Sequence, residues 1–250
     1  MATFVLVPGF WLGGWAWKNV TEKLRGTGHE VFPVTLTGLG EKVHLGSAAT
    51  NLDTHVEDVV NLIKYNELDD VYLAGHSYAG VVITAVADNI PENIAKLIYV
   101  DSAPLPDNVS QIDFFSPEQL EKFEKSIEEN GDGWKLALPS WQDLDEGNNL
   151  KDLTDADKNL IEKLSTPQPF NPARQKVSLK NPLRKDLLKL AIWCEMNSAE
   201  VRELLKEDLP LFSELKDENF EFVDLPTGHY PMFSRPAELA DLLMKAAEES

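Results

Sequence analysis

The sequence predicts an α/β fold, with a mostly parallel, doubly wound sheet covered by helices on both faces and a helical cap inserted between two strands. Three observations lead to this class. Short runs of β-branched, aliphatic and aromatic residues alternate with helical patterns along most of the 250 residues. One such run, Val71–Ala74, leads directly into a Gly-x-Ser-x-Gly turn, and a long polar and acidic segment interrupts the alternation after residue 104.

Six short apolar runs are expected to form the sheet, because such runs between turn residues are typical of strands buried on both faces. In chain order they are Phe4–Val7, Glu30–Val34, Val71–Ala74, Lys96–Val100, Leu188–Trp193 and Phe220–Val223. In a parallel sheet the ligand crevice lies at the carboxyl ends of the strands. Residues that directly follow these runs are therefore the first candidates for a functional site.

Helical patterns separate the strands, as expected where helices connect parallel strands. They cover Ala16–Arg25, Leu52–Tyr65, Tyr78–Asn89, Ser198–Lys206 and Ala237–Glu248. The third contains the almost wholly apolar stretch Val81–Ala87, which is typical of a helix buried against a sheet.

Residues 105–185 are predicted to form the inserted cap, and residues 1–104 and 186–250 the core. The cap sequence has helical stretches at Pro117–Glu129 and Thr154–Leu164, followed by prolines at positions 167, 169 and 172. Five aromatic residues are expected to face inward over the crevice: Phe114, Phe115, Trp134, Trp141 and Phe170. The alternative is a solvated helical excursion whose aromatics pack into a small core of its own.

The most informative motif is Gly75-His76-Ser77-Tyr78-Ala79-Gly80, between a predicted strand and a predicted helix. This order predicts a sharp turn that holds the serine in a strained conformation with its hydroxyl exposed. The small residues at positions 75, 79 and 80 leave room where strand and helix crowd together. Ser77 is therefore the candidate nucleophile. For the motif taken alone, the alternative is a Gly-rich turn with an incidental serine.

A serine hydroxyl needs a base within hydrogen-bond reach to act as a nucleophile near neutral pH. His229 is the expected base, because it follows the last strand in a Gly/Pro loop that can bend toward the crevice. His29 precedes a strand at the end opposite the crevice, and His76 is expected to point into the sheet. His44 and His55 are expected to be solvent-exposed, on a loop and on a helix.

A third group, a carboxylate, would orient the imidazole and stabilise its charged form. On this topology the order along the chain is serine, acid, histidine. Asp101 and Glu195 both follow strands in the required interval. We favour Asp101, since its strand neighbours the one before the serine, and retain Glu195 as the alternative. Asp224 lies on the last strand and is expected to be structural.

Two backbone N–H groups are expected to stabilise a developing oxyanion. One belongs to Tyr78, just after the serine. The other belongs to Phe10, in the Gly-rich loop Val7-Pro8-Gly9-Phe10-Trp11-Leu12-Gly13-Gly14-Trp15 that follows the first strand. An ordinary turn is the alternative for this loop. A phosphate-binding loop is a poor fit, because neither Gly-x-Gly-x-x-Gly nor Gly-Lys-Ser occurs.

Composition excludes several classes of function. A net charge of −19 argues against nucleic-acid and anionic-membrane partners. The single cysteine, Cys194, excludes an intrachain disulfide and is typical of a reducing compartment. The first residues lack the pattern of a signal peptide and no apolar run reaches transmembrane length, so a cytoplasmic location is expected. The composition does not decide between a monomer and a homodimer.

The combination of motifs resembles the α/β-hydrolase superfamily. Within it, the chain is similar to the group of plant methyl esterases, plant hydroxynitrile lyases and small bacterial esterases. The matching pieces are Val5–Trp17, Leu36-Thr37-Gly38-Leu39-Gly40, the Gly-His-Ser-Tyr-Ala-Gly turn, and the His229 loop through Arg235-Pro236. They span the chain apart from the cap. The resemblance implies an α/β-hydrolase fold, a serine–histidine–acid triad and no metal or other cofactor.

Two departures from the family pattern bear on the site. The family usually has His-Gly where this chain has Pro8-Gly9, which affects the geometry of the oxyanion loop. It usually has an aspartate shortly after the strand that follows the cap, where this chain reads Cys194-Glu195-Met196-Asn197. Some α/β-hydrolases instead take the acid from the preceding strand end, which is the position of Asp101.

The expected function is that of a serine esterase acting on small, largely apolar, uncharged carboxylic esters through an acyl-enzyme. A ligand-binding receptor or inactive relative on the same fold is the alternative from another class. Lyase chemistry is disfavoured. Plant hydroxynitrile lyases of this group have a lysine after the catalytic histidine and a threonine after the first-loop histidine, where this chain has Tyr230 and Gly9.

Overall fold

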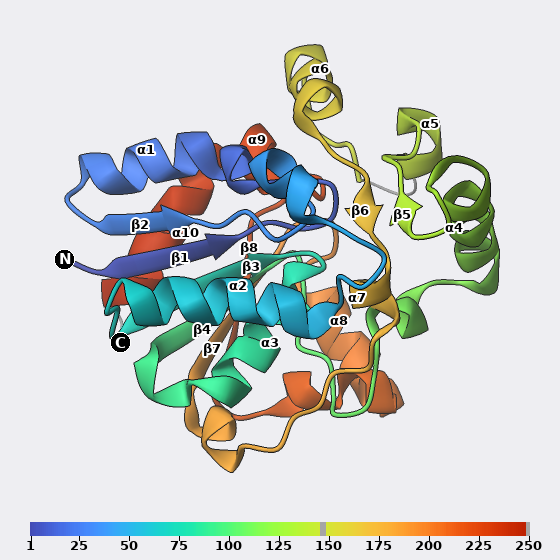
Figure 1. Cartoon of the computed structure of the whole chain (residues 1–250). Coiled ribbons are helices and arrows are strands. Elements are labelled where there is room, and N and C mark those ends of the chain that lie inside the picture. Colours follow the sequence, from blue (N-terminus) through green and yellow to red (C-terminus); the bar gives the residue numbers. More distant parts are fainter. Residues whose placement is uncertain (146–148, 249–250) are drawn as a thin grey trace.

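The computed structural model describes residues 1–145 and 149–248. Residues 146–148 of the predicted cap and residues 249–250 of the predicted core lie outside the described residues. The described chain forms a parallel sheet with helices on both faces, and a group of helices and short strands beyond one end of the sheet (Figure 1). The predicted α/β-hydrolase fold is confirmed.

The main sheet has six parallel strands in the order β2-β1-β3-β4-β7-β8. Their bounds are β1 Thr3–Val7, β2 Glu30–Pro33, β3 Val71–His76, β4 Ile94–Val100, β7 Leu188–Trp193 and β8 Phe220–Asp224. The strand order reverses between β1 and β3, where Val7 pairs with Gly75. Such a switch point is where ligand crevices form in open α/β sheets. The loops after β1 and β3 therefore start side by side.

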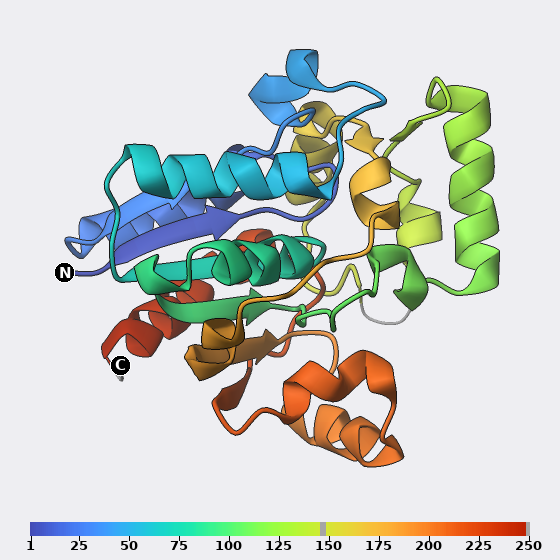
Figure 2. The same cartoon turned by 60° about the horizontal axis from the view of Figure 1, so that its bottom comes forward.

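Ten α-helices are assigned in the described residues. They are α1 Lys18–Gly26, α2 Leu52–Tyr65, α3 Ala79–Asn89, α4 Pro117–Asn130, α5 Trp141–Leu144, α6 Asp155–Leu164, α7 Asn171–Arg174, α8 Ser198–Leu204, α9 Pro231–Ser234 and α10 Pro236–Glu248. Helices α1 and α10 cover one face of the sheet, and α2 and α3 cover the other (Figures 1 and 2).

The two halves of the core follow from the alternation of side chains along each strand. In β1, Val5 and Val7 pack into the cluster shared with α2 and α3. Phe4 and Leu6 point to the opposite face and join the cluster shared with α1 and α10. All four side chains are completely buried, which explains why this strand is apolar at each position from Phe4 to Val7 rather than at alternate ones.

All six predicted strands occur: β7 has the predicted bounds, and each of the other five is shifted by one or two residues at one end. Strand β3 runs two residues beyond the predicted end at Ala74, because Gly75 and His76 still pair with Tyr99 and Val100 of β4. The predicted helix Ala16–Arg25 divides into a 3-10 turn over Gly14–Trp17 and helix α1. The predicted helix Ser198–Lys206 likewise ends as α8 at Leu204 and continues as the 3-10 turn Leu205–Glu207.

In its described residues, the segment 105–185 lies mostly beyond the carboxyl ends of the core strands (Figure 2), and its last residues return along α3, where the N–H groups of Lys180 and Asn181 donate to Asp88. It carries α4 to α7 and a two-stranded antiparallel sheet, β5 Lys135–Leu136 and β6 Gln168–Pro169. Both predicted helices occur, and each begins at a capping side chain. Ser116 accepts a hydrogen bond from Gln119 N, and Thr154 accepts one from Asp157 N.

The prediction that five aromatics face the crevice is only partly right. Phe114 and Phe115 line cavities beside Ser77, and Phe170 packs against the Phe10 ring. Trp141 instead donates its indole N–H to Glu162 of α6, and Trp134 lies under the Lys135 ammonium group. The Trp141 ring thus connects α5 to α6 within the inserted segment.

Across the two described stretches, no helix is both long and apolar enough to cross a membrane.

The strand-to-helix turn allows a test of the packing. A Cβ atom at Gly75 would lie 2.8 Å from the Ala79 carbonyl oxygen and 3.0 Å from Ile83 Cγ2. We expect Gly75→Ala to destabilise the protein by about 1–3 kcal/mol, because the backbone of α3 must move to make room. Gly26→Ala is the matched control, since a Cβ there meets nothing within 4 Å. Thermal unfolding of the two variants should show a lower Tm for Gly75→Ala alone, and equal values would contradict the crowding.

Candidate active site

Ser77 lies at the apex of the turn between β3 and α3, in a left-handed backbone conformation with φ of +53°. A non-glycine residue adopts this conformation only where the surroundings enforce it. Two contacts do so here: the Ser77 N–H donates to the Val100 carbonyl at 3.2 Å, and the Ser77 carbonyl accepts from Ser102 Oγ at 2.5 Å. The turn therefore holds the serine hydroxyl out from the sheet edge.

His229 lies beside this hydroxyl, with Nε2 2.8 Å from Ser77 Oγ. Its loop follows β8 and is held by the inserted segment, because the N–H groups of Gly228 and His229 donate to the carbonyls of Lys151 and Asn149. A Cβ at Gly228 would lie 2.4 Å from the Asn149 carbonyl oxygen. Only glycine permits this close approach, which brings the imidazole over Ser77.

Asp101 holds the other side of the imidazole, with Oδ2 2.6 Å from His229 Nδ1. Its second oxygen, Oδ1, accepts the N–H groups of Cys194 at 3.0 Å and Glu195 at 3.3 Å. The backbone of Asp101 is also left-handed, with φ of +44°, and its N–H donates to the Ile192 carbonyl. The carboxylate is therefore fixed between the ends of β4 and β7 and aimed at the imidazole.

Glu195, the alternative acid, contacts the same nitrogen. Its Oε2 lies 3.3 Å from His229 Nδ1, and its side chain is 27% exposed against 6% for Asp101. The shorter contact and the two backbone donors favour Asp101 as the orienting group. Glu195 adds a second negative charge beside the imidazole. The sequence analysis treated Asp101 and Glu195 as alternatives, whereas both carboxylates contact His229 Nδ1.

These contacts shift the ionisation of the site. Burial lowers the pKa of His229, but hydrogen bonds and charge from Asp101 and Glu195 outweigh it, so the net effect is a pKa above the ordinary value of 6.5. Burial raises the pKa of Asp101, and the His229 contact together with the Cys194 N–H lowers it below its ordinary value. The pair therefore favours a charged carboxylate beside an imidazole that readily accepts a proton.

His76 was expected to point into the sheet, and its buried side chain lies against the His229 loop. Burial is the main cause that lowers the pKa of His76 to about 3, so its ring is neutral. Its Nε2 donates to the His229 carbonyl at 2.6 Å, which requires the proton on that nitrogen. His76 thus fixes the backbone of His229. Its Nδ1 is buried and has no protein partner in residues 1–145 and 149–248.

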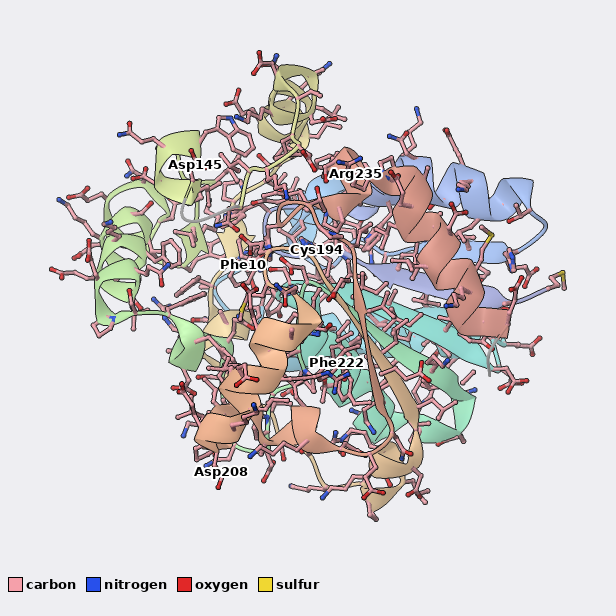
Figure 3. The ribbon with its side chains drawn as sticks, turned by 180° about the vertical axis from the view of Figure 1, so that it is seen from behind. Phe10, Asp145, Cys194, Asp208, Phe222 and Arg235 are labelled. Atoms are coloured by element: carbon pink, nitrogen blue, oxygen red, sulfur yellow. The ribbon has the colours of Figure 1, made fainter. Side chains whose placement is uncertain are left out.

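Phe10 and Tyr78, the predicted oxyanion donors, lie together at the switch point. Their rings stack with centroids 4.7 Å apart, and both residues line a cavity of about 150 Å³ that also touches Ser77 and His229. Within the described chain, neither the Phe10 N–H nor the Tyr78 N–H donates to a protein acceptor. The two N–H groups thus have no protein hydrogen bond there, and their residues line the same small cavity as Ser77. In Figure 3, Phe10 and Cys194 are labelled near the ends of the core strands.

Trp11 anchors the loop that carries Phe10, a role the sequence reasoning missed. Its backbone is left-handed, with φ of +63°. Its N–H donates to Gln168 Oε1 at 3.2 Å and its indole N–H to the Leu136 carbonyl at 3.0 Å, while its carbonyl accepts from Thr166 N. The loop after β1 is thus held by the two short strands of the inserted segment.

His55 corrects a prediction. It was expected to be solvent-exposed on a helix, but its exposed fraction is 0%. Its Nε2 donates to the Thr37 carbonyl at 3.0 Å, so its Nδ1 accepts the Tyr78 hydroxyl at 2.9 Å. Burial lowers the pKa of His55 to about 4, which keeps it neutral. The signal was in the sequence, since His55 shares a helical face with Leu52, Val56, Val59 and Ile63.

The remaining candidates lie away from Ser77. His29 accepts the Ala2 N–H near the amino ends of the strands, and His44 contacts the Glu41 carbonyl at the surface. Asp224 is structural, as expected, because it accepts the N–H and hydroxyl of Ser198 at the start of α8.

Metal-binding capacity is limited to the same groups. Asp101, Glu195 and His229 form the one cluster of three with donor atoms within 4.8 Å of one another in the described part of the chain. Within that cluster, His229 Nδ1 is hydrogen-bonded to Asp101 Oδ2 at 2.6 Å.

Comparison with known proteins places the chain among hydrolases. A carbendazim hydrolyzing esterase from Nocardioides sp. (strain SG-4G) is 49% identical over 102 residues, which cover 41% of this chain and 42% of the relative. The chain thus matches less than half the length of this relative. Putative methylesterase 14 of Arabidopsis thaliana is 26% identical over 261 residues, covering 98% of this chain and 72% of the relative.

Solved structures agree on the fold. An extracellular alpha/beta-hydrolase from a Paenibacillus species, described as a structural and functional homologue of tobacco salicylic acid binding protein 2, superposes with a TM-score of 0.79. It is 25% identical, and the match covers 98% of this chain and 99% of that one. The Arabidopsis methylesterase MES16 superposes with a TM-score of 0.76 at 20% identity, covering both chains completely.

The family model described as the alpha/beta hydrolase family matches residues 4–242, from the first strand to the last helix. This range includes the turn at Ser77, the carboxylate at Asp101 and the loop at His229. The chain therefore belongs to the alpha/beta hydrolase family.

Proposed function

We propose that the protein is a serine esterase that hydrolyses small, largely apolar, uncharged carboxylic esters through an acyl-enzyme. The observation that carries the proposal is the continuous hydrogen-bonded chain from Ser77 Oγ through His229 to Asp101, with contacts of 2.8 and 2.6 Å. Nucleophile, base and orienting acid within hydrogen-bond reach are what acyl transfer by serine requires. The relatives named as esterases and methylesterases support the same reaction class.

In the acylation step, Ser77 Oγ attacks the ester carbonyl carbon while its proton passes to His229 Nε2. The carbonyl oxygen becomes negative and accepts hydrogen bonds from the Phe10 and Tyr78 N–H groups. The bond from carbon to the alkoxy oxygen then breaks. The leaving oxygen takes the proton from Nε2 and departs as an alcohol, which leaves the acyl group on Ser77.

In the deacylation step, water attacks the acyl carbon and gives a proton to His229 Nε2. The bond from carbon to Ser77 Oγ breaks, Oγ takes the proton back, and the carboxylic acid leaves. Throughout, Asp101 holds the Nδ1 proton and stabilises the imidazolium that forms in each step. Every proton is carried by the chain's own groups.

The lining of the site supports the substrate class. The cavity at Ser77 is bounded by aromatic rings, among them Phe10, Phe115 and Tyr230. A second cavity of about 240 Å³ touches Ser77 from another side and is lined by Leu105, Phe114, Trp193 and Phe212. Apolar walls around a few polar groups favour uncharged, apolar substituents. The net charge of −19 opposes anionic substrates.

The role of Ser77 as the nucleophile can be tested by removing its hydroxyl. Ser77→Ala should lower kcat/KM for p-nitrophenyl acetate by roughly a thousandfold or more, because no other hydroxyl replaces the attacking oxygen. Ser213→Ala, at an exposed serine that lines a surface pocket beside the starts of β7 and β8, is the control and should retain wild-type rates. Equal rates for Ser77→Ala and wild type would refute the proposal. A single stoichiometric burst in the wild type, without turnover, would indicate a ligand-binding relative.

The second prediction separates the two carboxylates. Asp101→Asn should lower kcat by about four orders of magnitude, since the amide leaves the imidazole in the wrong tautomer. Glu195→Gln should change kcat only severalfold, because its contact with His229 Nδ1 is longer and more exposed. Circular dichroism spectra should confirm that both variants are folded. The reverse order of losses would assign the role of Asp101 to Glu195.

The third prediction concerns pH. Both carboxylates stabilise the imidazolium and raise the pKa of His229, so the neutral base forms only at higher pH and the acidic limb of kcat/KM lies above pH 6.5. Glu195→Gln removes one of these charges and should move that limb to lower pH. Glu200→Gln, at a nearby glutamate with no contact to His229, is the control. A limb that does not move in Glu195→Gln would show that its charge has no influence on the base.

A further inference from the structure

A larger cavity lies next to the site, within the inserted segment. Its volume is about 460 Å³, and it is enclosed between α4 and residues 136–144. The cavity at Ser77 measures only about 150 Å³. Pockets that hold small organic ligands usually have volumes of about 300–1,000 Å³. Together with the cavity of about 240 Å³ on the other side of Ser77, the smaller space has room for the ester group and small substituents. The larger space has the size of a ligand site by itself.

The two cavities are connected by shared walls. Phe123 of α4, Leu144 of α5 and Asn149 line both of them. The cavities are therefore adjacent, and a substituent of an ester bound at Ser77 that passed these three side chains would enter the larger one. We call this larger space the α4 cavity.

The walls of the α4 cavity have two chemical characters. One wall is a stripe of polar residues on α4 at helical spacing: Gln119, Lys122, Ser126 and Asn130. The facing wall is apolar, with Leu136, Leu138 and Pro139. A flat ring can pack one face on the apolar wall while its edge meets the amide and hydroxyl groups of the stripe.

The charges at the α4 cavity have partners, which favours a neutral ligand. Lys122 Nζ lies 3.2 Å from Glu118 Oε1, and Asp143 Oδ2 accepts the Ser140 hydroxyl at 2.5 Å. An anionic ligand would be repelled by the negative field of a chain with a net charge of −19. A ligand of either charge would lose hydration on entering the cavity. A neutral ring with hydrogen-bond acceptors at its edge meets neither cost.

We propose that the α4 cavity binds a neutral aromatic or heteroaromatic ring attached to the ester, so that the substrates are elongated esters with a ring a few bonds from the carbonyl group. This inference rests on the proposed esterase function and adds the class of substituent to it. Binding of the ring contributes to recognition, and the chemistry at Ser77 is unchanged.

The test uses two substrates that differ only in the ring, ethyl butanoate and ethyl 4-phenylbutanoate. In the wild type we expect at least a tenfold higher kcat/KM for the phenyl ester, mainly through a lower KM. Ser126→Trp fills the α4 cavity from the polar wall and should bring the ratio of the two esters close to one, with ethyl butanoate unaffected. A 4-carboxyphenyl analogue should lose the wild-type preference, because it carries a charge.

Lys125→Trp is the matched control, since it adds the same ring to the neighbouring position of α4, where the side chain is 71% exposed. It should keep the wild-type ratio. Ala137→Phe fills the α4 cavity from the facing wall and is the second cavity-filling variant, to be used if Ser126→Trp does not fold. A ratio that survives in a folded cavity-filling variant, or a wild-type ratio near one, would overturn the proposal.

A binding measurement separates this inference from the esterase proposal. Calorimetry with the non-hydrolysable ketones heptan-4-one and 7-phenylheptan-4-one reports ring binding whether or not esters are turned over. Tighter binding of the phenyl ketone by tenfold or more, lost in Ser126→Trp, would support the α4 cavity even if no ester were hydrolysed. Equal affinities for the two ketones would reject it even in an active esterase.

Discussion

The structure depends on one strained turn. Ser77 adopts a left-handed backbone conformation because β3 must pass into α3 within a few residues, and no relaxed conformation makes so sharp a corner. The turn is tolerated because its neighbours are small. Cβ atoms at Gly9, Gly75 and Gly80 would lie within 3 Å of Nδ1 of His76, the Ala79 carbonyl and the Ser102 hydroxyl, respectively. The strain is offset by burial of α3, whose residues 79–87 are all buried.

The parallel sheet brings the remaining groups to this turn. The ends of β1, β3, β4, β7 and β8 lie along one edge, so short loops from each reach the same space. Phe10 follows β1, Asp101 follows β4, and His229 follows β8. The backbone at the end of β7 adds the Cys194 and Glu195 N–H groups that hold Asp101. Each functional group therefore extends from a rigid strand, which limits how far it can move from its partner.

The inserted segment is part of the site's framework as well as its cover. It holds Trp11 through Gln168, Leu136 and Thr166, and it holds the His229 loop through Asn149 and Lys151. On the other side, His55 holds the Tyr78 hydroxyl while the Tyr78 ring stacks on Phe10. The two proposed oxyanion donors are thus supported from both the core and the inserted segment. Changes in the segment can alter the geometry at Ser77 as well as the shape of the cavities.

The sequence by itself determined the class of fold, the six strands and the edge of the sheet where the candidate residues meet, because hydrophobic periodicity and turn residues are local signals. The strand-end rule selected Ser77, Asp101 and His229 from many polar residues, and the structure brings these three side chains within hydrogen-bond distance. Their catalytic roles are a proposal that the experiments above test. Strand ends shifted by a residue or two, since pairing across the sheet decides them.

Only the tertiary structure decided which distant groups meet. The Trp11–Gln168 contact spans 157 residues of sequence, and the contact of Glu195 with the imidazole depends on how the chain leaves β7 beside Asp101. The burial of His55 under Tyr78 and the turning of Trp141 toward Glu162 follow from packing between separate elements. A local pattern specifies the face of a helix or strand, but the partner on that face is set by the three-dimensional path of the whole chain.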